Sequence, residues 1–475
     1  MSINVDLPQH LIDQWRARIS RFLQNNPQNR SLFTVELPNS VEGMTEALRN
    51  ILEPGTDTFD EVRSHAAAGS ATVGMLAAYA GKPYAATLIQ RGPGCLPIAT
   101  RHTQHQIYEL RSAVEAVDGP VAIDTSSLFI LRLVSDEWEP ISSYFSRMFF
   151  SNPSRTDIAH TVANYSRQIS GMLGWDRQAG IPRMYEVSRD EQTQWRQHAE
   201  WMLDKAQHLD LFSRTALTNI FSEPHQNGWD ERFLPWLAAL DYAIEQGVPL
   251  YADDIALRSL ARERGIPTFG TTSLLEALVR KGDLHRIKYS THMDELRFNY
   301  CVDLPLDVHS LARVAERENW RAGASSFIFS RPIVWSTAEQ ALSAWRGLCS
   351  QAIRRDPKHL PGWLYQAVRG ACESRENHER GHTAAALMLM ALTISGVDRL
   401  LLSDLLVATR AALQTLNTDD PLIPFTRLTL DLMSNAHDLQ FAARAVLSLT
   451  EHLPETDKAT IRTIVFSDSP GNAPQ

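Results

Sequence analysis

Short apolar runs and amphipathic helical stretches alternate in the middle of the chain. Residues 247–254, GVPLYADD, form an apolar run of strand length that ends in two acids. The next stretch, IALRSLARERG, has its apolar residues at helical spacing and ends at Gly265. IPTFGT and SLLEALVRKG repeat this alternation, and Ser273 and Glu276 have the spacing of a capping box at the start of the second helix. A strand, a helix, a strand and a helix at this spacing predict right-handed crossovers and a parallel sheet.

The flanking regions have different patterns. Residues 1–118 mix helical stretches with an Ala/Gly-rich middle, and Gly119-Pro120 interrupts the chain before the apolar run VAID. Beyond residue 290 the pattern becomes almost wholly helical, and RRDPKHLPGWLYQAV resembles one unit of a helical-hairpin repeat, without a strict internal period. We therefore predict an α/β fold with helical flanks, divided into a mixed and helical domain (1–118), an α/β domain (119–289), an all-helical domain (290–465) and a disordered tail (466–475).

Three acids stand at the carboxyl ends of the predicted strands. Asp124 follows VAI, Asp253 and Asp254 follow VPLYA, and a helix begins directly after each site. Ligands of an open parallel sheet bind beyond the carboxyl ends of its strands, and carboxylates gathered there repel one another unless a cation neutralises them. Hard oxygen ligands suit Mg²⁺ or Mn²⁺, which can activate water and brace a phosphodiester oxygen. Helix capping is the alternative use of a single aspartate, but acids in both the opening and the closing unit of one sheet favour a metal site.

These segments resemble a known family. VAIDTSSLFIL is similar to the first strand and helix of PIN-domain nucleases, and residues 253–282 resemble the closing part of that fold. The resemblance implies a PIN-like three-layer fold with a central parallel sheet, in which acids bind a divalent metal and cleave a phosphodiester, most often in RNA. It places Asp124 at the first acidic position and Asp253-Asp254 at the last, with Asp254 favoured as the ligand and Asp253 assisting it. RNA is therefore favoured over DNA as the substrate.

The middle acidic position of the family has no clear match in this sequence. The separation of Asp124 from Asp254 exceeds that of a minimal PIN domain, which predicts an insertion. The candidates for the missing metal ligand are Asp230, Asp241, Glu200 and Asp204. The last two are helical neighbours four residues apart, a spacing more typical of a solvent-exposed acidic face. If no middle acid reaches the site, the domain is a catalytically inactive PIN-like scaffold that binds nucleic acid or a protein, and this is the second hypothesis.

Hydroxyl and basic residues near the strand ends are candidates for substrate binding. They are Thr125, Ser126, Arg258, Arg262, Thr271 and Thr272. Helix capping is the alternative use of the two threonines at 271 and 272. Between residues 258 and 288 seven basic residues stand against three acids, a local net charge of +4. This stretch predicts a basic wall that holds phosphates beside the metal, unless ion pairs on the helix faces neutralise it.

Composition and charge narrow the class of protein. The 475 residues carry 46 Lys and Arg against 55 Asp and Glu, a formal net charge of −9, which argues against coating of nucleic acid through bulk charge. Four cysteines without a C-x-x-C pair argue against a cysteine zinc site or a disulfide framework. Without a signal-peptide core or an apolar run of membrane-spanning length, we expect a cytoplasmic protein with no membrane partner. The helical C-terminal region is the expected platform for a protein partner, and a homo-oligomer is left open.

A literal H-E-x-x-H motif provides a third hypothesis. His378 and His382 lie four residues apart, so on a helix both can bind Zn²⁺ while Glu379 acts as a general base, as in zinc metallopeptidases. The flank CESRENHERGH is highly charged and Gly381 weakens a helix, whereas a buried catalytic helix is apolar before its first histidine. No third ligand stands in a recognisable second motif. Zinc is therefore the weaker expectation.

Overall fold

The structure is a computed structural model of the chain. It describes residues 56–91, 96–100, 105–167, 171–176, 181–221 and 229–467, with isolated positions before residue 56. The chain forms two compact units, one of residues 1–60 with 169–189 and the other of residues 61–168 with 190–475. In the described part, no helix is both long and apolar enough to cross a membrane.

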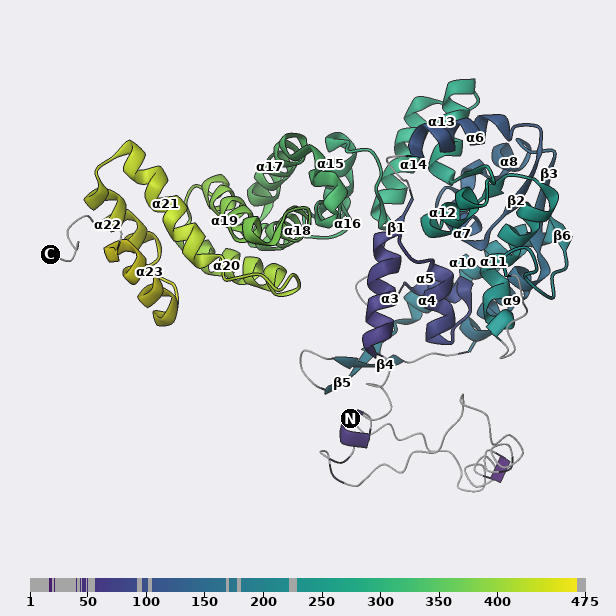
Figure 1. The fold of residues 1–475 in the computed structure, drawn as a ribbon, viewed down its shortest axis with the longest axis horizontal. Helices are drawn as coiled ribbons and strands as arrows, with labels where there is room; N and C mark the ends of the chain where they lie inside the picture. The colour runs from purple at the N-terminus through teal and green to yellow at the C-terminus, as the bar shows by residue number, and fades with distance from the viewer. Residues whose placement is uncertain are drawn as a thin grey trace. The chain divides into compact units, whose positions relative to one another are not determined.

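The larger unit contains a five-stranded parallel sheet, of which Figure 1 labels β2, β3 and β6. Its strands are β2 (Pro120–Ile123), β3 (Arg147–Ser151), β6 (Asp210–Phe212), β7 (Leu250–Tyr251) and β8 (Thr268–Phe269), in the order β6-β3-β2-β7-β8. The chain runs outward from β2 to β6, returns to β7 beside β2 and continues to β8. The strand order therefore reverses between β2 and β7, and a parallel sheet binds ligands at such a point. The predicted α/β fold is confirmed.

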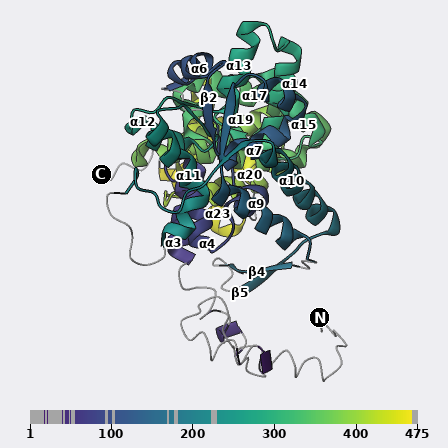
Figure 2. The same ribbon diagram turned by 90° about the vertical axis from the view of Figure 1, so that its right-hand side faces the viewer.

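Helices connect the strands and surround the sheet in both views (Figure 1, Figure 2). They are α7 (Thr125–Leu133), α8 (Trp138–Ser142), α9 (Asn152–Tyr165), α10 (Arg189–Gln207), α11 (Trp229–Gln246), α12 (Ile255–Glu263) and α13 (Thr271–Lys281). Helix α11 packs across β2, β3 and β7. Helices α7 and α10 meet where the rings of Phe129 and His198 stack at 4.8 Å. The two strand-and-helix pairs predicted after residue 247 are confirmed as β7 with α12 and β8 with α13.

One detail of the sequence interpretation is wrong. Helix α13 begins at Thr271, so Ser273 lies inside the helix and does not cap it together with Glu276. The N-cap residue is Gly270, which has no side chain to offer. The Asp253 carboxylate accepts the Thr271 N–H instead, at 2.9 Å. The helix start is therefore satisfied by an acid from the neighbouring strand end, which a local sequence window cannot show.

Three helices and most of a fourth precede the sheet in the larger unit. They are α3 (Thr56–Ala68), α4 (Val73–Ala80), α5 (Tyr84–Gln90) and α6 (Gln106–Glu115). Helix α4 packs against α11, α5 against α7 and α9, and α6 against α13. Strand β1 (Ile98–Ala99) pairs in parallel with β9 (Cys301–Val302), which follows α14 (Arg286–Phe298). In the smaller unit, β4 (Gly171–Asp176) and β5 (Ile181–Glu186) form an antiparallel pair.

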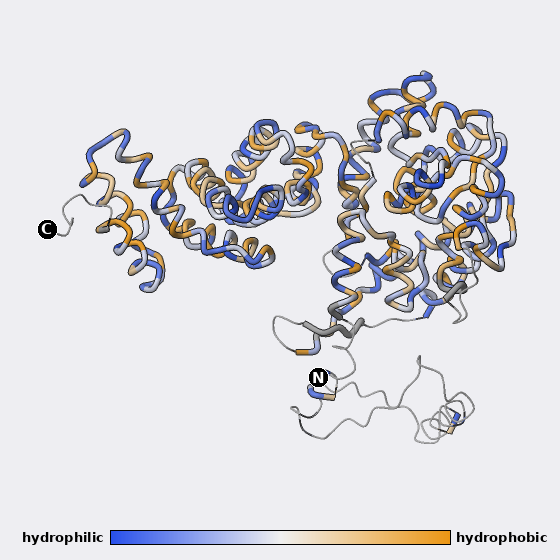
Figure 3. The backbone as a smooth tube through the Cα atoms, in the orientation of Figure 1, coloured by the Kyte–Doolittle hydropathy of each residue, from blue (hydrophilic) through white to orange (hydrophobic). Residues whose placement is uncertain are grey.

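The C-terminal region is helical, as predicted. Its helices are α15 (Val308–Arg317), α16 (Ala324–Phe327), α17 (Ala338–Arg355), α18 (Leu360–Glu373), α19 (Asn377–Ile394), α20 (Arg399–Gln414), α21 (Leu422–Ala436), α22 (Leu439–Leu449) and α23 (Glu455–Ser467). Neighbouring helices pack on one another around a continuous apolar core, and Figure 3 shows hydrophobic and hydrophilic positions alternating along them. Trp345 and Trp363 are fully buried, and each donates its indole N–H to a backbone carbonyl. Phe466 and Ser467 still belong to α23, and the rest of the predicted tail lies outside the described residues. The four domain boundaries stay a prediction.

Candidate carboxylate site at the strand ends

Asp124 stands at the end of β2 and caps α7. Its Oδ2 accepts the Ser126 N–H at 2.8 Å and the Tyr84 hydroxyl at 3.1 Å. Its Oδ1 is buried and has no hydrogen-bond partner in the described part of the chain. A carboxylate oxygen without a donor in the interior is costly, so this atom is the one in the site that most favours a proton or a cation.

Asp254 stands at the end of the neighbouring strand. The Asp124 N–H donates to the Tyr251 carbonyl at 2.9 Å, which brings the ends of β2 and β7 together. Asp254 Oδ1 accepts the first N–H groups of α12, from Ala256 at 3.1 Å and Leu257 at 3.2 Å. Its Oδ2 accepts the Val73 N–H, at the start of α4, at 2.7 Å. Each of the two acids thus caps the helix that follows it with one oxygen.

Ser126 holds the two strand ends in register. Its Oγ accepts the N–H groups of Asp253 at 2.9 Å and of Asp254 at 3.0 Å. The residue was predicted as a substrate contact, and the structure instead uses its hydroxyl to position the acids. Thr125, its neighbour, is buried with an Oγ1 that has no hydrogen-bond partner among the described residues, so it stays a candidate.

Burial disfavours the charged form of both carboxylates. Burial, with a smaller contribution from the charge of Asp254, raises the pKa of Asp124 to about 7 despite the opposing hydrogen bonds of Ser126 and Tyr84. Burial also raises the pKa of Asp254 to about 6. Two buried carboxyl groups this close cannot both be charged at little cost, so the pair binds a proton or a cation in preference to staying doubly ionised.

Asp253 points in another direction. Its carboxylate accepts the N–H and the hydroxyl of Thr271, and burial raises its pKa to about 6 against the opposing charge of Arg258. Thr272 donates its hydroxyl to the Thr100 carbonyl at 3.5 Å. Asp253 therefore caps α13 through Thr271. Its carboxylate shares no hydrogen-bond donor with the carboxylates of Asp124 and Asp254 among the described residues.

Most basic residues of the predicted wall form ion pairs, and Arg258 and Arg262 do so at buried or nearly buried positions. Arg258 is fully buried, and it donates to Glu109 Oε1 at 3.0 Å and to the carbonyls of Ala252 and Thr100. Arg262 donates to the same Glu109 oxygen at 3.0 Å. The other ion pairs of this stretch are Arg280–Glu276, Lys281–Asp283 and Lys288–Glu137. The structure does not place Arg258 where it could meet a phosphate, and its guanidinium instead ties α12 to α6.

Three of the four middle acids proposed from the sequence, Asp241, Glu200 and Asp204, have other partners than the strand-end pair. Asp241 is fully buried, but it accepts the N–H of Asn219 at 2.8 Å and pairs with Arg214. Glu200 and Asp204 lie on the exposed face of α10 in ion pairs with Arg196 and Lys205. The side chain of Asp230 lies outside the described residues.

Asp157 is the acid that sequence reasoning missed. It lies on α9, and its two oxygens accept the N–H groups of Tyr84 at 3.0 Å and Ala85 at 2.8 Å. Tyr84 bonds Asp124 through its hydroxyl, so one residue bridges the two acids. Burial raises the pKa of Asp157 to about 6. The signal was the run FFSNPSRTD, in which a strand, a Ser cap and a Pro at the helix start precede an acid on the buried face.

Comparison with known proteins agrees with this geometry. Residues 122–263 match the family model of the PIN domain associated with the TPR-GreAB-C-PIN system. This segment is a PIN-type domain. No curated protein and no solved structure gives a significant match to the chain. The PIN-like resemblance seen in the sequence is confirmed, and the activity and the site residues of the domain stay predictions.

The donor set of this PIN-like domain suits a hard divalent cation. Asp124 Oδ1 is buried and unpaired, Asp254 lies beside it, and carboxylate oxygens are the ligands that Mg²⁺ and Mn²⁺ prefer. In the described part of the chain, however, no three His, Cys, Asp or Glu side chains are grouped as they would be around a metal ion. The pair alone is an incomplete coordination sphere, and Asp157 is engaged by the start of α5.

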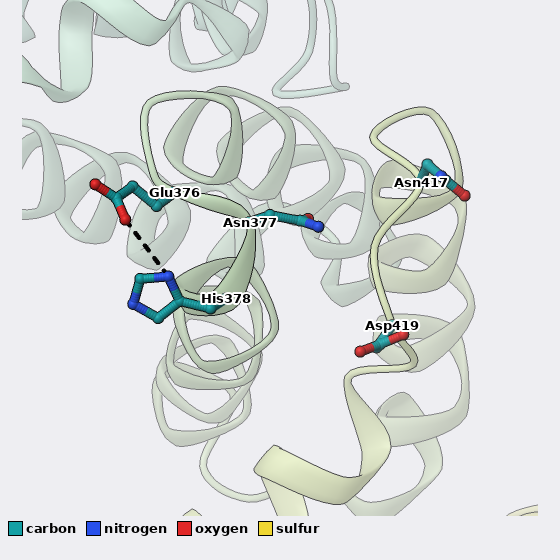
Figure 4. A pocket seen from close by; sticks show the side chains of 5 residues that line it. All are labelled: Glu376, Asn377, His378, Asn417 and Asp419. Carbon is teal, nitrogen blue, oxygen red and sulfur yellow. Dashed lines mark ion pairs between the residues drawn. The ribbon is translucent and has the colours of Figure 1, made fainter.

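The H-E-x-x-H motif lies at an exposed helix start, in contrast to the buried acids at the strand ends. His378 and His382 lie in the first turns of α19, both are exposed, and the His378 side chain keeps 76% of its surface accessible. Figure 4 shows His378 beside Glu376, with Asn417 and Asp419 on the loop across an open polar pocket. His378 Nδ1 lies 3.5 Å from Glu376 Oε2. This is a solvated helix start and not the buried helix that a catalytic zinc site requires.

Proposed function

We propose that the PIN-like domain is a metal-dependent nuclease that hydrolyses phosphodiester bonds, with RNA as the favoured substrate. The observation that carries the proposal is the pair of buried carboxylates at the point where the strand order reverses. Asp124 and Asp254 come from neighbouring parallel strands, and Ser126 fixes their separation through two backbone N–H groups. An enzyme site needs such preorganised, desolvated groups, and the match to a PIN domain supports the nuclease class.

The cation that this site would hold is Mg²⁺ or Mn²⁺. Asp124 Oδ1 and Asp254 Oδ2 are the oxygens that would bind it, because the other oxygen of each acid caps its own helix. When bound, such an ion lowers the pKa of a coordinated water and polarises a phosphoryl oxygen. Asp157 is the further acid closest to this pair by its contacts, and we propose it as the third ligand in place of Glu200 or Asp204.

In this proposal, the residues around Asp124 and Asp254 orient the two carboxylates and exclude water from them. The Ser126 hydroxyl and the caps of α7 and α12 hold both carboxylates in fixed orientations, so little reorganisation is needed when a ligand arrives. Burial excludes competing water from the same oxygens. Thr125 Oγ1 is buried, lacks a hydrogen-bond partner among the described residues and follows Asp124 directly, which makes it the strongest of the predicted substrate contacts.

A cleavage assay tests the proposal. Labelled RNA and labelled single-stranded DNA are incubated with MnCl₂ and either wild type, Asp124→Asn, Asp254→Asn or Asp204→Asn. We expect cleavage by wild type and by the Asp204 variant, whose side chain is exposed, and a loss of about 100-fold or more in the first two variants. Equal cleavage by all four proteins would show that the strand-end acids are not the catalytic centre.

A catalytically inactive scaffold is the second candidate. It is favoured by the observation that each acid already satisfies a helix start, since Asp124, Asp254, Asp253 and Asp157 serve α7, α12, α13 and α5. In this case the domain binds nucleic acid or a protein without cleaving it. Calorimetric titration with MnCl₂ separates the two candidates, because a scaffold shows no binding that the Asp124→Asn substitution removes.

We further propose that the helical region from α15 to α23 is a platform for a protein partner in the cytoplasm. Its stacked helices present apolar side chains to solvent, including Leu400, Val407 and Leu432, which are more than half exposed. Light scattering of the purified chain distinguishes a monomer from a homo-oligomer built on this surface. Pull-down with the chain carrying Leu400→Glu and Val407→Glu tests the partner: undiminished capture would exclude this face.

A further inference from the structure

The hairpin formed by α4 and α5, residues 73–90, covers the carboxylate site. Four of its hydrogen-bond donors reach three acids. The Val73 N–H donates to Asp254, the Tyr84 hydroxyl to Asp124, and the N–H groups of Tyr84 and Ala85 to Asp157. All four distances lie between 2.7 and 3.1 Å. This α4–α5 hairpin therefore supplies positive partial charge where a cation would otherwise neutralise the acids.

The donors come from helix starts that need acceptors. Val73 is the first residue of α4, and Tyr84 and Ala85 are the first two of α5. The N-cap of α5 is Pro83, which makes no side-chain hydrogen bond, so Asp157 takes the place of a cap. Each acid and each helix start thus satisfies the other, which explains why the hairpin docks at this place on the PIN-like domain.

The division of oxygens shows what opening the hairpin would do. Asp254 caps α12 with Oδ1 and gives only Oδ2 to Val73, while Asp124 keeps the Ser126 N–H on Oδ2 and leaves Oδ1 unpaired. Withdrawal of the hairpin would leave both helix caps intact. It would release Asp254 Oδ2 and both oxygens of Asp157, and carboxylate oxygens are the ligands that a hard divalent ion prefers.

We propose that the α4–α5 hairpin is an autoinhibitory cap, which competes with a divalent cation for the same carboxylate oxygens and keeps the nuclease closed until it is displaced. This inference rests on the proposed function. If the ion binds only when the hairpin is open, its apparent dissociation constant is the intrinsic constant divided by the fraction of molecules with an open hairpin. By linkage, the ion must loosen the hairpin by the same factor.

Gly74 offers a way to open the cap without touching any acid. A Cβ at this position would lie 2.1 Å from the indole ring of Trp236, so a larger residue forces α4 away from α11. Gly74→Val is therefore the opening variant, and Tyr84→Phe, which removes only the hydroxyl donor to Asp124, is a milder second one. Tyr79→Ala is the matched control, since Tyr79 lies on the same hairpin with 52% of its surface exposed.

The experiment uses the full chain and three measurements. MnCl₂ binding is measured by calorimetry, opening of residues 73–90 by amide hydrogen exchange, and RNA cleavage by the assay above. We expect Gly74→Val and Tyr84→Phe to bind Mn²⁺ about tenfold or more tightly than wild type, with faster exchange and faster cleavage, and Tyr79→Ala to match wild type. In wild type, MnCl₂ should accelerate exchange at residues 73–90, and Asp124→Asn should abolish that response.

The outcomes separate the cap from the nuclease. Cleavage that depends on Asp124 but is equal in wild type and both opening variants would overturn the cap and leave the nuclease standing. Faster exchange in Gly74→Val without any Mn²⁺ binding that depends on Asp124 would overturn both. Tighter Mn²⁺ binding and faster exchange in Tyr84→Phe alone, should Gly74→Val not fold, would still support the cap.

Discussion

Two regions of the chain carry residues that suit a metal ion, and they differ in burial: the acids at the strand ends are buried, whereas the histidines of the H-E-x-x-H motif are exposed. Asp124 and Asp254 come from separate strands 130 positions apart in the sequence, yet they share a buried corner of the sheet. His378 and His382 come from one helix and share its exposed face. Burial raises the pKa values of Asp124 and Asp254, whereas the side chains of His378 and His382 are exposed to solvent. Spacing in the sequence is thus a weaker guide to a metal site than convergence in the fold.

The difference has a physical origin. An i,i+4 spacing guarantees that two side chains share a helix face, but a closed metal site needs a third ligand from another element and exclusion of water. Parallel strands meet that requirement at their carboxyl ends, because each strand delivers its next residue to the same edge of the sheet.

The largest effect is expected from Arg258. Its guanidinium is fully buried and pairs with Glu109, so Arg258→Ala leaves that buried carboxylate with Arg262 as its remaining ion-pair partner among the described residues. We expect a loss of about 3–5 kcal/mol in the free energy of unfolding, measured by chemical denaturation. Arg264→Ala is the control, because Arg264 is exposed and its bonds in the described part of the chain go to two backbone carbonyls. Similar losses for both variants would contradict the buried role assigned to Arg258.

A smaller effect of opposite sign is expected at Asp124. Burial first, and then Asp254, raises its pKa from 3.8 to about 7 in the folded protein. Between those values the unfolded chain releases the proton while the folded chain keeps it, so the stability of wild type falls as pH rises. Without metal, Asp124→Asn should therefore be more stable than wild type at pH 8 by about 1–2 kcal/mol.

Thermal unfolding across the pH range provides the check. The advantage of Asp124→Asn should be absent only well below the unfolded-state pKa of 3.8, where both states of wild type are protonated, and should grow as pH rises to about 7. Asp204→Asn, at an exposed position of α10, should show no such trend. A constant difference between Asp124→Asn and wild type at every pH would contradict a buried, charge-coupled carboxylate.

The smallest effect is expected at the H-E-x-x-H motif. His378→Ala and His382→Ala should each change the free energy of unfolding by less than about 0.5 kcal/mol, because both side chains are exposed. RNA cleavage should be unchanged. Elemental analysis of wild type provides the decisive readout: stoichiometric zinc that is lost from the His378 variant would revive the peptidase hypothesis.

Much of the sheet could be predicted from the sequence, and part of the site could not. Apolar runs that end in Asp124 and Asp254 marked two strand ends, since a short buried strand followed by a helix has a local signature. Asp157 was missed because it lies inside a helix, where nothing local distinguishes a buried acid from a solvated one. Arg258 was misread for the related reason that its partner, Glu109, lies 149 positions away.

The sequence by itself determined the alternation of strands and helices, the helical C-terminal region and the two acids at the strand ends, because each depends on the hydrophobic period and on neighbouring residues. Tertiary structure alone decided which charges are buried, which acids meet and what covers them. The α4–α5 hairpin shows this most clearly, because an Ala/Gly-rich segment without a recognisable motif brings four donors to three acids. Burial and electrostatic coupling are properties of groups brought together by folding, and no local window of sequence contains them.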